Sequence, residues 1–337
     1  MSRGWLKAIA ETPSLKDRIA IVGLVDLDRD AADRLATEFG LTRAATSANL
    51  EEVLAGTRPE LLLDVVVPGA RRDVVATGLR HGCHVLSEKP MATSLADGRE
   101  LVALAEKAGR IHAIVQNRRF NEGVRRIRAT IESGALGTLN AVHCDFFVGA
   151  HFGGFREQME HVLLVDMAIH TLDAARFIAG KRPLAVYCHE SNPHSSWYAH
   201  GSVANAIFEF SDDVVFTYRG SWSAEGANTS WDSSWRIVGS KGTLLWDGEQ
   251  EFSAKVVSGS DGFFRPLDPL PIPPAPVDAE TRGHASVILN FIDSLEAGRQ
   301  PETVSTDNLN SLAMVFAAIE SARTRQRIQI ISLRTSQ

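Results

Sequence analysis

The chain has few cysteines, no long apolar run and no excess of positive charge, and each absence excludes a class of protein. Its three cysteines, Cys83, Cys144 and Cys188, are odd in number and too widely spaced for a metal knuckle. Such scattered cysteines are typical of reduced cytosolic thiols. No apolar stretch approaches the roughly 18 residues of a membrane span, and the first residues lack a signal-peptide pattern. We therefore expect a cytoplasmic protein that does not enter a membrane.

The formal net charge of −6 gives no electrostatic footprint for nucleic acid or an anionic membrane. The histidines show no ligand spacing, so we expect no metal site; they include His151, His161, His194 and His200. With 44% apolar residues, the 337-residue chain can bury the cores of about two domains.

The first third of the chain alternates β-branched runs with helical patterns, which is typical of a parallel sheet built from βαβ units. Strands are predicted at Ile19–Val25, Leu61–Val67, His84–Ser87 and Ile111–Gln116. Helices are predicted at Asp30–Phe39, Arg71–Gly82 and Leu95–Ala108. We assign residues 1–118 to a dinucleotide-binding domain.

After residue 118 the pattern changes to that of an α+β domain, which we extend over residues 119–337. Helices are predicted at Asn121–Ser133, Glu160–Ile178, Glu280–Ala297 and Asp307–Arg323. Strands are predicted at Thr138–Phe147, Ala185–His189, Val203–Phe210, Val214–Trp222, Trp235–Val238, Thr243–Trp246, Phe252–Val257 and Arg327–Leu333. Their alternation predicts a mainly antiparallel sheet, and the prolines of residues 266–276 predict an extended connector.

The start of the chain lacks the front of the dinucleotide-binding fingerprint, which is a strand, then G-x-G-x-x-G, then a helix. A helical pattern begins at Trp5, directly after Gly4, with no strand before it. Asp26 lies 26 − 4 = 22 residues beyond Gly4, close to the roughly 20-residue spacing of the fingerprint's acidic residue. The missing strand would lie in the middle of a doubly wound sheet, and its loss would leave backbone groups unpaired at about 1–3 kcal/mol each. We therefore expect the natural product to begin upstream of Met1.

Three groups of residues are candidates for chemistry. Glu88-Lys89-Pro90 follows a predicted strand, and open α/β sheets bind ligands at the carboxyl ends of their strands. Asp166 and His170 have the i, i+4 spacing of one helix face, although on spacing alone such a pair is more often a surface ion pair. Asp26 follows an earlier strand; it can accept a hydrogen bond from a ribose hydroxyl or cap the next helix, a role that Asp28 also suits.

Together with the segments Val115–Phe120 and Asp166–Asp173, these residues resemble the glucose-fructose oxidoreductase and inositol dehydrogenase (Gfo/Idh/MocA) family, over essentially the whole chain. The resemblance implies a Rossmann-like doubly wound parallel sheet, here without its first strand, followed by an α+β domain with a large open sheet. It implies an NAD(P)-dependent oxidoreductase acting on CH–OH groups of a sugar, cyclitol or related polyol. It also implies a homodimer or homotetramer.

The resemblance further implies roles for single residues. Lys89, Asp166 and His170 match the family's catalytic residues, and the Lys89-Pro90 peptide is expected to be cis. The expected cofactor contacts are Ser2, Asp26, Val67, Pro68, Glu88, Lys89, Asn117 and Arg156. Asp26 favours NAD because a carboxylate repels a 2′-phosphate, and Arg29 keeps NADP possible. Arg156 is equally well explained as an ordinary loop arginine.

Two other functions stay open. The first is a glycoside hydrolase that keeps NAD bound and oxidises the sugar transiently, which would show no net cofactor reduction. The second is a non-catalytic ligand sensor, against which the presence of Lys89, Asp166 and His170 together argues.

Overall fold

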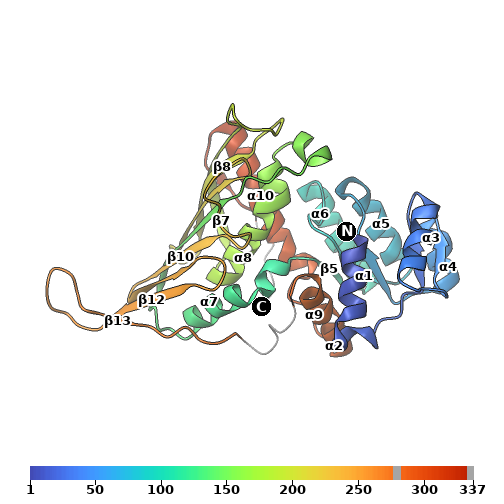
Figure 1. Ribbon diagram of the computed structural model, residues 1–337, viewed down its shortest axis with the longest axis horizontal. Helices are drawn as coiled ribbons and strands as arrows, with labels where there is room; N and C mark the ends of the chain where they lie inside the picture. Colours follow the sequence, from blue (N-terminus) through green and yellow to red (C-terminus); the bar gives the residue numbers. More distant parts are fainter. Residues whose placement is uncertain (276–281, 332–337) are drawn as a thin grey trace. The chain divides into compact units, whose positions relative to one another are not determined.

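The computed structural model describes residues 1–275 and 282–331, and the chain divides into two compact units (Figure 1). The first unit comprises Met1–Asn117 and Glu280–Leu309, and the second comprises Arg118–Ala279 and Asn310–Gln337. The first boundary lies next to the expected one at residue 118. The second domain, however, is not the unbroken segment that we expected, because residues 280–309 return to the first unit.

The first unit holds two short parallel sheets. One consists of β1 (Gly23–Val25) and β2 (Ala45–Ser47), and the other of β3 (Leu61–Asp64), β4 (His84–Ser87) and β5 (His112–Ile114). The helices are α1 (Ser2–Glu11), α2 (Pro13–Lys16), α3 (Arg29–Glu38), α4 (Leu50–Thr57), α5 (Pro68–Arg80), α6 (Leu95–Ala108) and α9 (His284–Glu296).

The parallel sheet of the first unit is split where the missing strand was expected. Within the described residues, β1 pairs only with β2, and β3 pairs only with β4. Each therefore has one edge without a strand neighbour there. The neighbouring side chains of Val22 and Val25 remain 39% and 36% exposed, as expected for a core that is open at this place.

Local signals explain the best-defined helix, α6. The Ser94 side chain caps it by accepting a hydrogen bond from the Asp97 amide, and Gly109 ends it in the left-handed conformation at φ 61°. Its buried face, which includes Leu101 and Ala105, packs with Val75 of α5 and Val85 of β4. These contacts form the core that supports the carboxyl end of β4.

Helix α9 is part of the first unit because its polar and apolar contacts are there. Arg18 pairs with Asp293 and Glu296, each at 2.7 Å, and Phe291 is 1% exposed. The amide of Ile114 in β5 also donates to the Thr303 carbonyl at 3.0 Å. An amphipathic helix does not reveal from sequence which unit will cover its apolar face.

The second unit is built on a nine-stranded sheet in the order β13-β12-β11-β10-β6-β9-β8-β7-β14. The strands are β6 (Leu139–Phe147), β7 (Pro183–Ser191), β8 (Val203–Phe210), β9 (Val215–Ser221), β10 (Ser234–Gly239), β11 (Gly242–Trp246), β12 (Phe252–Val257), β13 (Leu267–Pro269) and β14 (Ile328–Gln329). Only β6 and β9 pair in parallel among these strands, so the expected mainly antiparallel sheet is confirmed.

Helices cover one face of this sheet. They include α7 (Glu122–Glu132), α8 (Ile169–Ala179) and α10 (Ser305–Thr324), of which α10 crosses the unit boundary (Figure 1). In β6, Val142, Cys144 and Phe146 are buried, whereas His143 and Asp145 alternate with them on the opposite face. The sheet therefore has a covered apolar face and an open polar face.

Several predicted elements differ from the structure. The strand expected at Ile19–Val25 starts only at Gly23, and β2 and α4 were not predicted. The single helix expected over Glu160–Ile178 is a π-helical turn at Leu163–Ala168 followed by α8. The connector expected at 266–276 contains β13. The expected helix start at Glu280, the end of the last expected strand and connector residue 276 lie outside the described residues.

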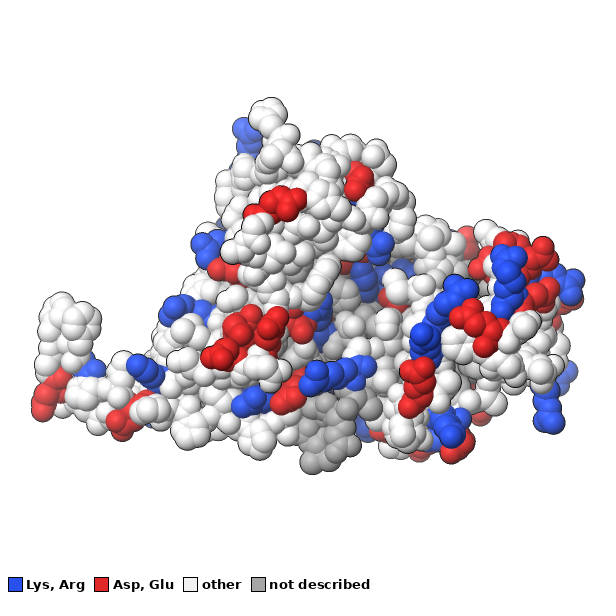
Figure 2. Space-filling view, in the orientation of Figure 1, with Lys and Arg blue, Asp and Glu red and all other residues white. Residues whose placement is uncertain are grey.

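Among the described residues, no helix combines the length and apolarity that crossing a bilayer requires. On the face shown in Figure 2, lysines and arginines are interspersed with acidic residues rather than gathered into one basic patch.

Candidate functional site

The segment Glu88-Lys89-Pro90 lies where the sequence predicted it, directly after β4. The Lys89-Pro90 peptide bond is cis, as expected. The Lys89 side chain is half-buried, between the buried residues Glu88 and Pro90. The turn thus presents one amine at the carboxyl end of a parallel strand.

A buried arginine holds this turn in place. Arg71 in α5 is 1% exposed; its Nε donates to Asp64 Oδ2 at 2.8 Å, its Nη1 to the Pro90 carbonyl at 2.5 Å and its Nη2 to the Val66 carbonyl at 2.6 Å. Burial raises the pKa of Asp64, although the charge of Arg71 works in the opposite direction. The role of Arg71 could not be predicted from sequence, because a buried arginine carries no periodic signal.

The Glu88 carboxylate is held by two side chains of its own unit. Trp5 Nε1 donates to Glu88 Oε1 at 2.8 Å, and His284 Nε2 donates to the same oxygen at 2.9 Å. Burial opposes ionisation of Glu88, but the hydrogen bonds from His284 and Trp5 outweigh it, and the pKa lies below its usual value. Glu88 was expected to contact the cofactor; that role stays a prediction, while the structure shows that it anchors α1 and α9.

Asp26 is exposed immediately after β1, with Oδ1 accepting from the Asp28 amide at 3.0 Å. The cap of α3 is Asp28, which accepts from the Asp30 amide at 3.1 Å. Asp26 is therefore not the helix cap, and its carboxylate is accessible to a ribose hydroxyl.

The other expected cofactor residues of the first unit lie at the N-termini of helices or, for Asn117, at the end of the unit's first segment. Ser2 begins α1, and Val67 and Pro68 begin α5; neither helix has a side-chain cap at its start. Uncapped N-terminal amides suit phosphate oxygens. Asn117 has a buried Oδ1 without a hydrogen-bond partner among the described residues. With Asp26, these groups fit a dinucleotide.

In the second unit, Asp166 lies on the π-helical turn and His170 on the first turn of α8. Asp166 Oδ2 accepts from Arg156 Nε at 2.9 Å, and the two side chains are 13% and 27% exposed. Single π-helical turns inside α-helices are frequent at functional sites. The structure thus pairs Arg156, which was expected beside the cofactor, with a predicted catalytic carboxylate; its cofactor role stays a prediction.

The Arg156 guanidinium lies against two aromatic rings, 5.2 Å from the Phe152 ring centroid and 5.0 Å from that of Phe155. Its Nη atoms make no hydrogen bond within the part of the chain that the structure describes. These donors are therefore available to a ligand oxygen.

Further aromatic side chains extend this environment. Phe152 packs edge-on against Trp222 at 5.2 Å and lies 6.3 Å from Trp231, which is 49% exposed. The cluster continues through Tyr198 and Trp197 to His151, whose ring stacks on Trp197 at 3.7 Å. An aromatic wall beside a charged pair is a surface that can hold the apolar face of a sugar ring.

The start of the π-helical turn is held by an ion pair. His161 Nδ1 and Glu190 Oε2 are 2.5 Å apart, and His161 has a left-handed backbone at φ 53°. The hydrogen bond that His161 donates to Glu190 raises the pKa of His161, while burial works against it.

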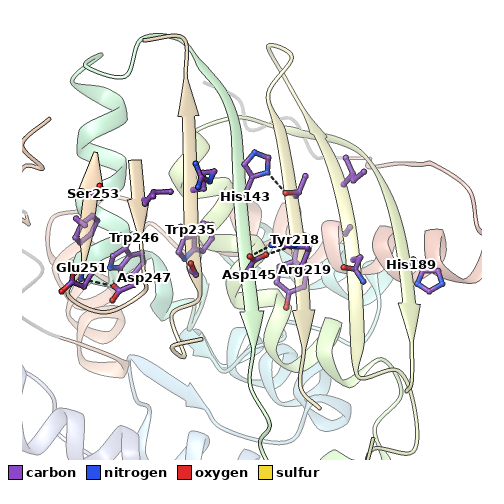
Figure 3. Close-up of a pocket in the computed structure, with 18 of the residues that line it drawn as sticks. His143, Asp145, His189, Tyr218, Arg219, Trp235, Trp246, Asp247, Glu251 and Ser253 are labelled. Carbon is purple, nitrogen blue, oxygen red and sulfur yellow. Dashed lines mark hydrogen bonds and ion pairs between the residues drawn. The ribbon is translucent and has the colours of Figure 1, made fainter. Parts of the chain in front are cut away.

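A separate cavity of about 930 Å³ lies on the open face of the sheet (Figure 3). Its lining includes His143, Asp145, Arg219, Trp246 and Glu251, and none of the expected site residues. The candidate site is therefore elsewhere. Across residues 1–275 and 282–331, no cluster of three or more His, Cys, Asp or Glu side chains is placed to hold a metal ion, and the three cysteines are buried and free.

Known proteins are similar to this chain in sequence and in fold. The family model of oxidoreductases with an NAD-binding Rossmann fold matches residues 5–116. The model of the GFO/IDH/MocA C-terminal domain matches residues 124–245. Protein y4oX of Sinorhizobium fredii is 26% identical, covering 93% of this chain and 88% of its own length. A D-apiose dehydrogenase of Paraburkholderia graminis is 25% identical, covering 94% and 84%.

Among solved structures, an oxidoreductase from Agrobacterium radiobacter in complex with NAD⁺, L-tartaric acid and magnesium superposes with a TM-score of 0.81. It is 21% identical in sequence, and the match covers 96% of each chain. Both halves of the sequence match one family, in the order in which that family joins them. The chain therefore belongs to the Gfo/Idh/MocA family of oxidoreductases with an NAD-binding Rossmann fold.

Proposed function

We propose that this protein is a dehydrogenase that transfers a hydride between a nicotinamide cofactor and a secondary alcohol of a sugar, cyclitol or related polyol. The observation that supports this best is the Arg156–Asp166 pair beside an aromatic wall. The carboxylate accepts hydrogen bonds from ring hydroxyls, and the guanidinium donates to them. The aromatic faces suit the C–H face of a ring. The dehydrogenase activity named for the D-apiose relative points to the same substrate class.

Oxidation of an alcohol requires a base for the hydroxyl proton and a positive group that stabilises the developing alkoxide. We assign the base to His170, because histidine is the side chain that most often exchanges a proton near neutral pH. We assign the positive group to Lys89, which the cis peptide turn presents after β4. Asp166 orients the substrate through its hydroxyls.

Bound NAD supplies the hydride acceptor for this chemistry. Asp26 holds the adenosine ribose, and it favours NAD over NADP because its carboxylate would repel a 2′-phosphate. The backbone amides at the uncapped N-termini of α1 and α5 would donate to the pyrophosphate oxygens. Asn117 would accept a hydrogen bond from the cofactor through its unpaired Oδ1.

The test is a panel of sugars, inositols and sugar acids, each incubated with NAD or NADP while absorbance of the reduced cofactor is followed. We expect net reduction with at least one polyol, faster with NAD. Lys89→Ala should lower turnover by at least about 100-fold, whereas Lys107→Ala, which changes an exposed lysine on α6, should leave it unchanged. Turnover by Lys89→Ala at the rate of the unmodified protein would refute the assignment.

A further inference from the structure

Arg156 lies on a short 3₁₀ turn whose backbone is fastened to the neighbouring loop. The Ala150 carbonyl accepts from the Tyr198 hydroxyl at 2.7 Å, and the Glu157 carbonyl accepts from the Ala199 amide at 2.8 Å. Both donors belong to the loop that joins β7 to β8. A side chain on a segment that is fixed in this way loses less conformational freedom when it binds a ligand. The structure therefore places Arg156 before any ligand arrives.

The acid that follows Arg156 in sequence is bonded by the same segment. Glu157 Oε1 accepts from the Gly153 amide at 2.9 Å. Gly153 and Gly154 have left-handed backbones at φ 66° and 65°, a conformation that glycine adopts without strain. The turn that they form thus keeps the Glu157 carboxylate on the backbone rather than on the Arg156 guanidinium.

Asp166 uses one of the five N–H groups that an arginine side chain carries. The Nε of Arg156 donates to Asp166 Oδ2 at 2.9 Å, whereas its two Nη atoms bond to no residue that the structure describes. The edge formed by Nη1 and Nη2 can bind both oxygens of one carboxylate in a plane. The Arg156 side chain is 27% exposed, so this edge can be reached by a ligand.

Exposed aromatic rings lie beside the same guanidinium. Phe152 and Phe155, whose rings contact it, are 42% and 66% exposed, and Trp231 beside Phe152 is 49% exposed. Large apolar side chains left exposed together indicate a surface that a ligand covers. The ligand that this surface suits has a C–H face for the rings and an anionic group for the arginine.

The charges of the site favour a monoanion. Asp166 already pairs with Arg156, so an anion on the same guanidinium brings a second negative charge near the first. A carboxylate adds one charge and matches two coplanar N–H donors. A phosphate group adds about 1.5 to 2 charges at neutral pH. The carboxylate is therefore the better fit.

We propose that the substrate is a sugar acid of the uronate class, a pyranose ring that carries a carboxylate. The carboxylate binds both Nη atoms of Arg156, and the ring lies against Phe152 and Trp231. The carboxylate does not react; a secondary hydroxyl of the ring is the group that is oxidised. This inference rests on the proposed function and names the substrate class of the same site.

Isothermal titration calorimetry of the full chain tests the proposal, with saturating NADH present because NADH cannot accept a hydride. The ligands are D-glucuronate and D-galacturonate, each compared with its amide, which keeps the ring and replaces the carboxylate by a neutral group. At least one acid should bind at least about tenfold more tightly than its amide. Arg156→Met should lower the affinity for that acid at least about tenfold and leave that for the amide nearly unchanged. Arg156→Lys, which keeps the charge without the planar fork, should give an intermediate affinity for the acid.

Arg323→Met is the matched control, because it breaks an exposed ion pair with Glu320, 2.7 Å long, on α10 of the same unit. Exposed pairs contribute little, so both affinities should stay as in the unmodified protein. The affinity of Arg156→Met for NAD without sugar should also be unchanged. Circular dichroism of each variant establishes that it is folded.

Acids that bind no better than their amides overturn the proposal. So does an Arg156→Met variant that loses acid and amide alike, or that loses NAD, because Arg156 would then serve the whole site or the cofactor. Turnover separates this inference from the proposed function. Oxidation of neutral polyols without preference for acids keeps the dehydrogenase and removes the carboxylate assignment. Acid binding that depends on Arg156, without reduction of NAD by any polyol, does the reverse.

Discussion

Arg71 is a buried cation that joins three segments of the first unit. Its guanidinium donates hydrogen bonds to the Asp64 carboxylate, the Val66 carbonyl and the Pro90 carbonyl. Each of these acceptors lies at the carboxyl end of β3 or in the turn after β4. The residue therefore positions the turn that carries Lys89, without being a candidate for the chemistry itself.

Arg71→Met should destabilise the chain by about 3 kcal/mol, because it leaves a buried carboxylate and two buried carbonyls without their donor. Arg71→Lys keeps the charge but not the planar fork, so it should cost less. Urea unfolding measures both effects. Turnover should fall in the same order, and a methionine variant as stable and active as the parent would contradict this role.

His112 should make the first unit sensitive to acid. It is fully buried, shares a hydrogen bond with Ser87 Oγ at 3.0 Å, and its pKa is lowered to about 3, first by burial and then by the charge of Arg71. In the unfolded chain the imidazole binds a proton near pH 6.5. The contribution of neutral His112 to the free energy of unfolding is therefore fully present above about pH 6.5. Below that pH it falls by up to about 1.4 kcal/mol per pH unit.

His112→Gln should remove this contribution while keeping a partner for Ser87. Unfolding of both proteins by urea at several pH values between about 4 and 8 measures the difference. The parent should lose stability faster than the variant as the pH falls. Parallel curves would show that His112 does not remain neutral in the folded protein.

At the scale of elements, the π-helical turn Leu163–Ala168 is the least regular part of the candidate site. It carries Asp166, and its start is fixed by the pair of His161 and Glu190. The pKa of His161 is raised in the folded protein. Its pairing with Glu190 therefore stabilises the fold fully below the pKa of the unfolded state, and this contribution is lost as the pH rises through the pKa of the folded state.

Glu190→Gln should therefore destabilise the chain more at about pH 6 than at about pH 9. Thermal unfolding at the two pH values measures this. The matched control is Glu225→Gln, because Glu225 pairs with His151 at 2.7 Å on the surface, with side chains 69% and 59% exposed. Exposed pairs contribute little, so the control should be neutral at both. Equal losses for Glu190→Gln at the two pH values would contradict the role of His161.

Elements with local signals could be predicted from sequence, and others could not. The bounds of β4 and α6 agree with the prediction because Ser94 and Gly109 mark the helix ends and the apolar run marks the strand. The π-helical turn has no sequence signature that separates it from α-helix. The strand expected from Ile19 begins late, because pairing with β2 reaches only Gly23–Val25.

The chemical groups of the candidate site could be named from the sequence, but the residues that they contact could not. Lys89, Asp166 and His170 stood out through motif and spacing, and the cis peptide followed from the resemblance. The hydrogen bond between Trp5 and Glu88 joins residues 83 positions apart, and no local pattern indicates such a partner. The pairing of Arg156 with Asp166 depends on the path of an irregular loop, which sequence periodicity does not determine.

At the scale of the whole molecule, the chain leaves the first unit at Asn117 and returns to it at Glu280. Helix α9 then adds Val287, Ile288 and Phe291 to the buried residues of that unit. The first unit therefore cannot be completed by the amino-terminal segment alone.

A chain ending at residue 279 should lose the cooperative unfolding of the first unit. Without α9, Arg18 loses both carboxylate partners and Glu88 loses its bond from His284. Limited proteolysis should then cleave α1 and α2 rapidly. The second unit loses α10 and β14 with the same truncation, so it should become more sensitive as well. A chain ending at residue 331 serves as the control. Equal resistance of α1 in the two chains would show that the first unit folds without α9.

Trp5 gives the first unit an optical signal of its own. It is the single tryptophan of that unit, since the other five of the chain's six lie between residues 197 and 246. Its indole N–H is bonded to the residue next to Lys89. The difference in fluorescence between the unmodified protein and Trp5→Phe therefore reports on Trp5 alone. Quenching or a spectral shift of this emission would report nucleotide binding during a titration, before any substrate is identified.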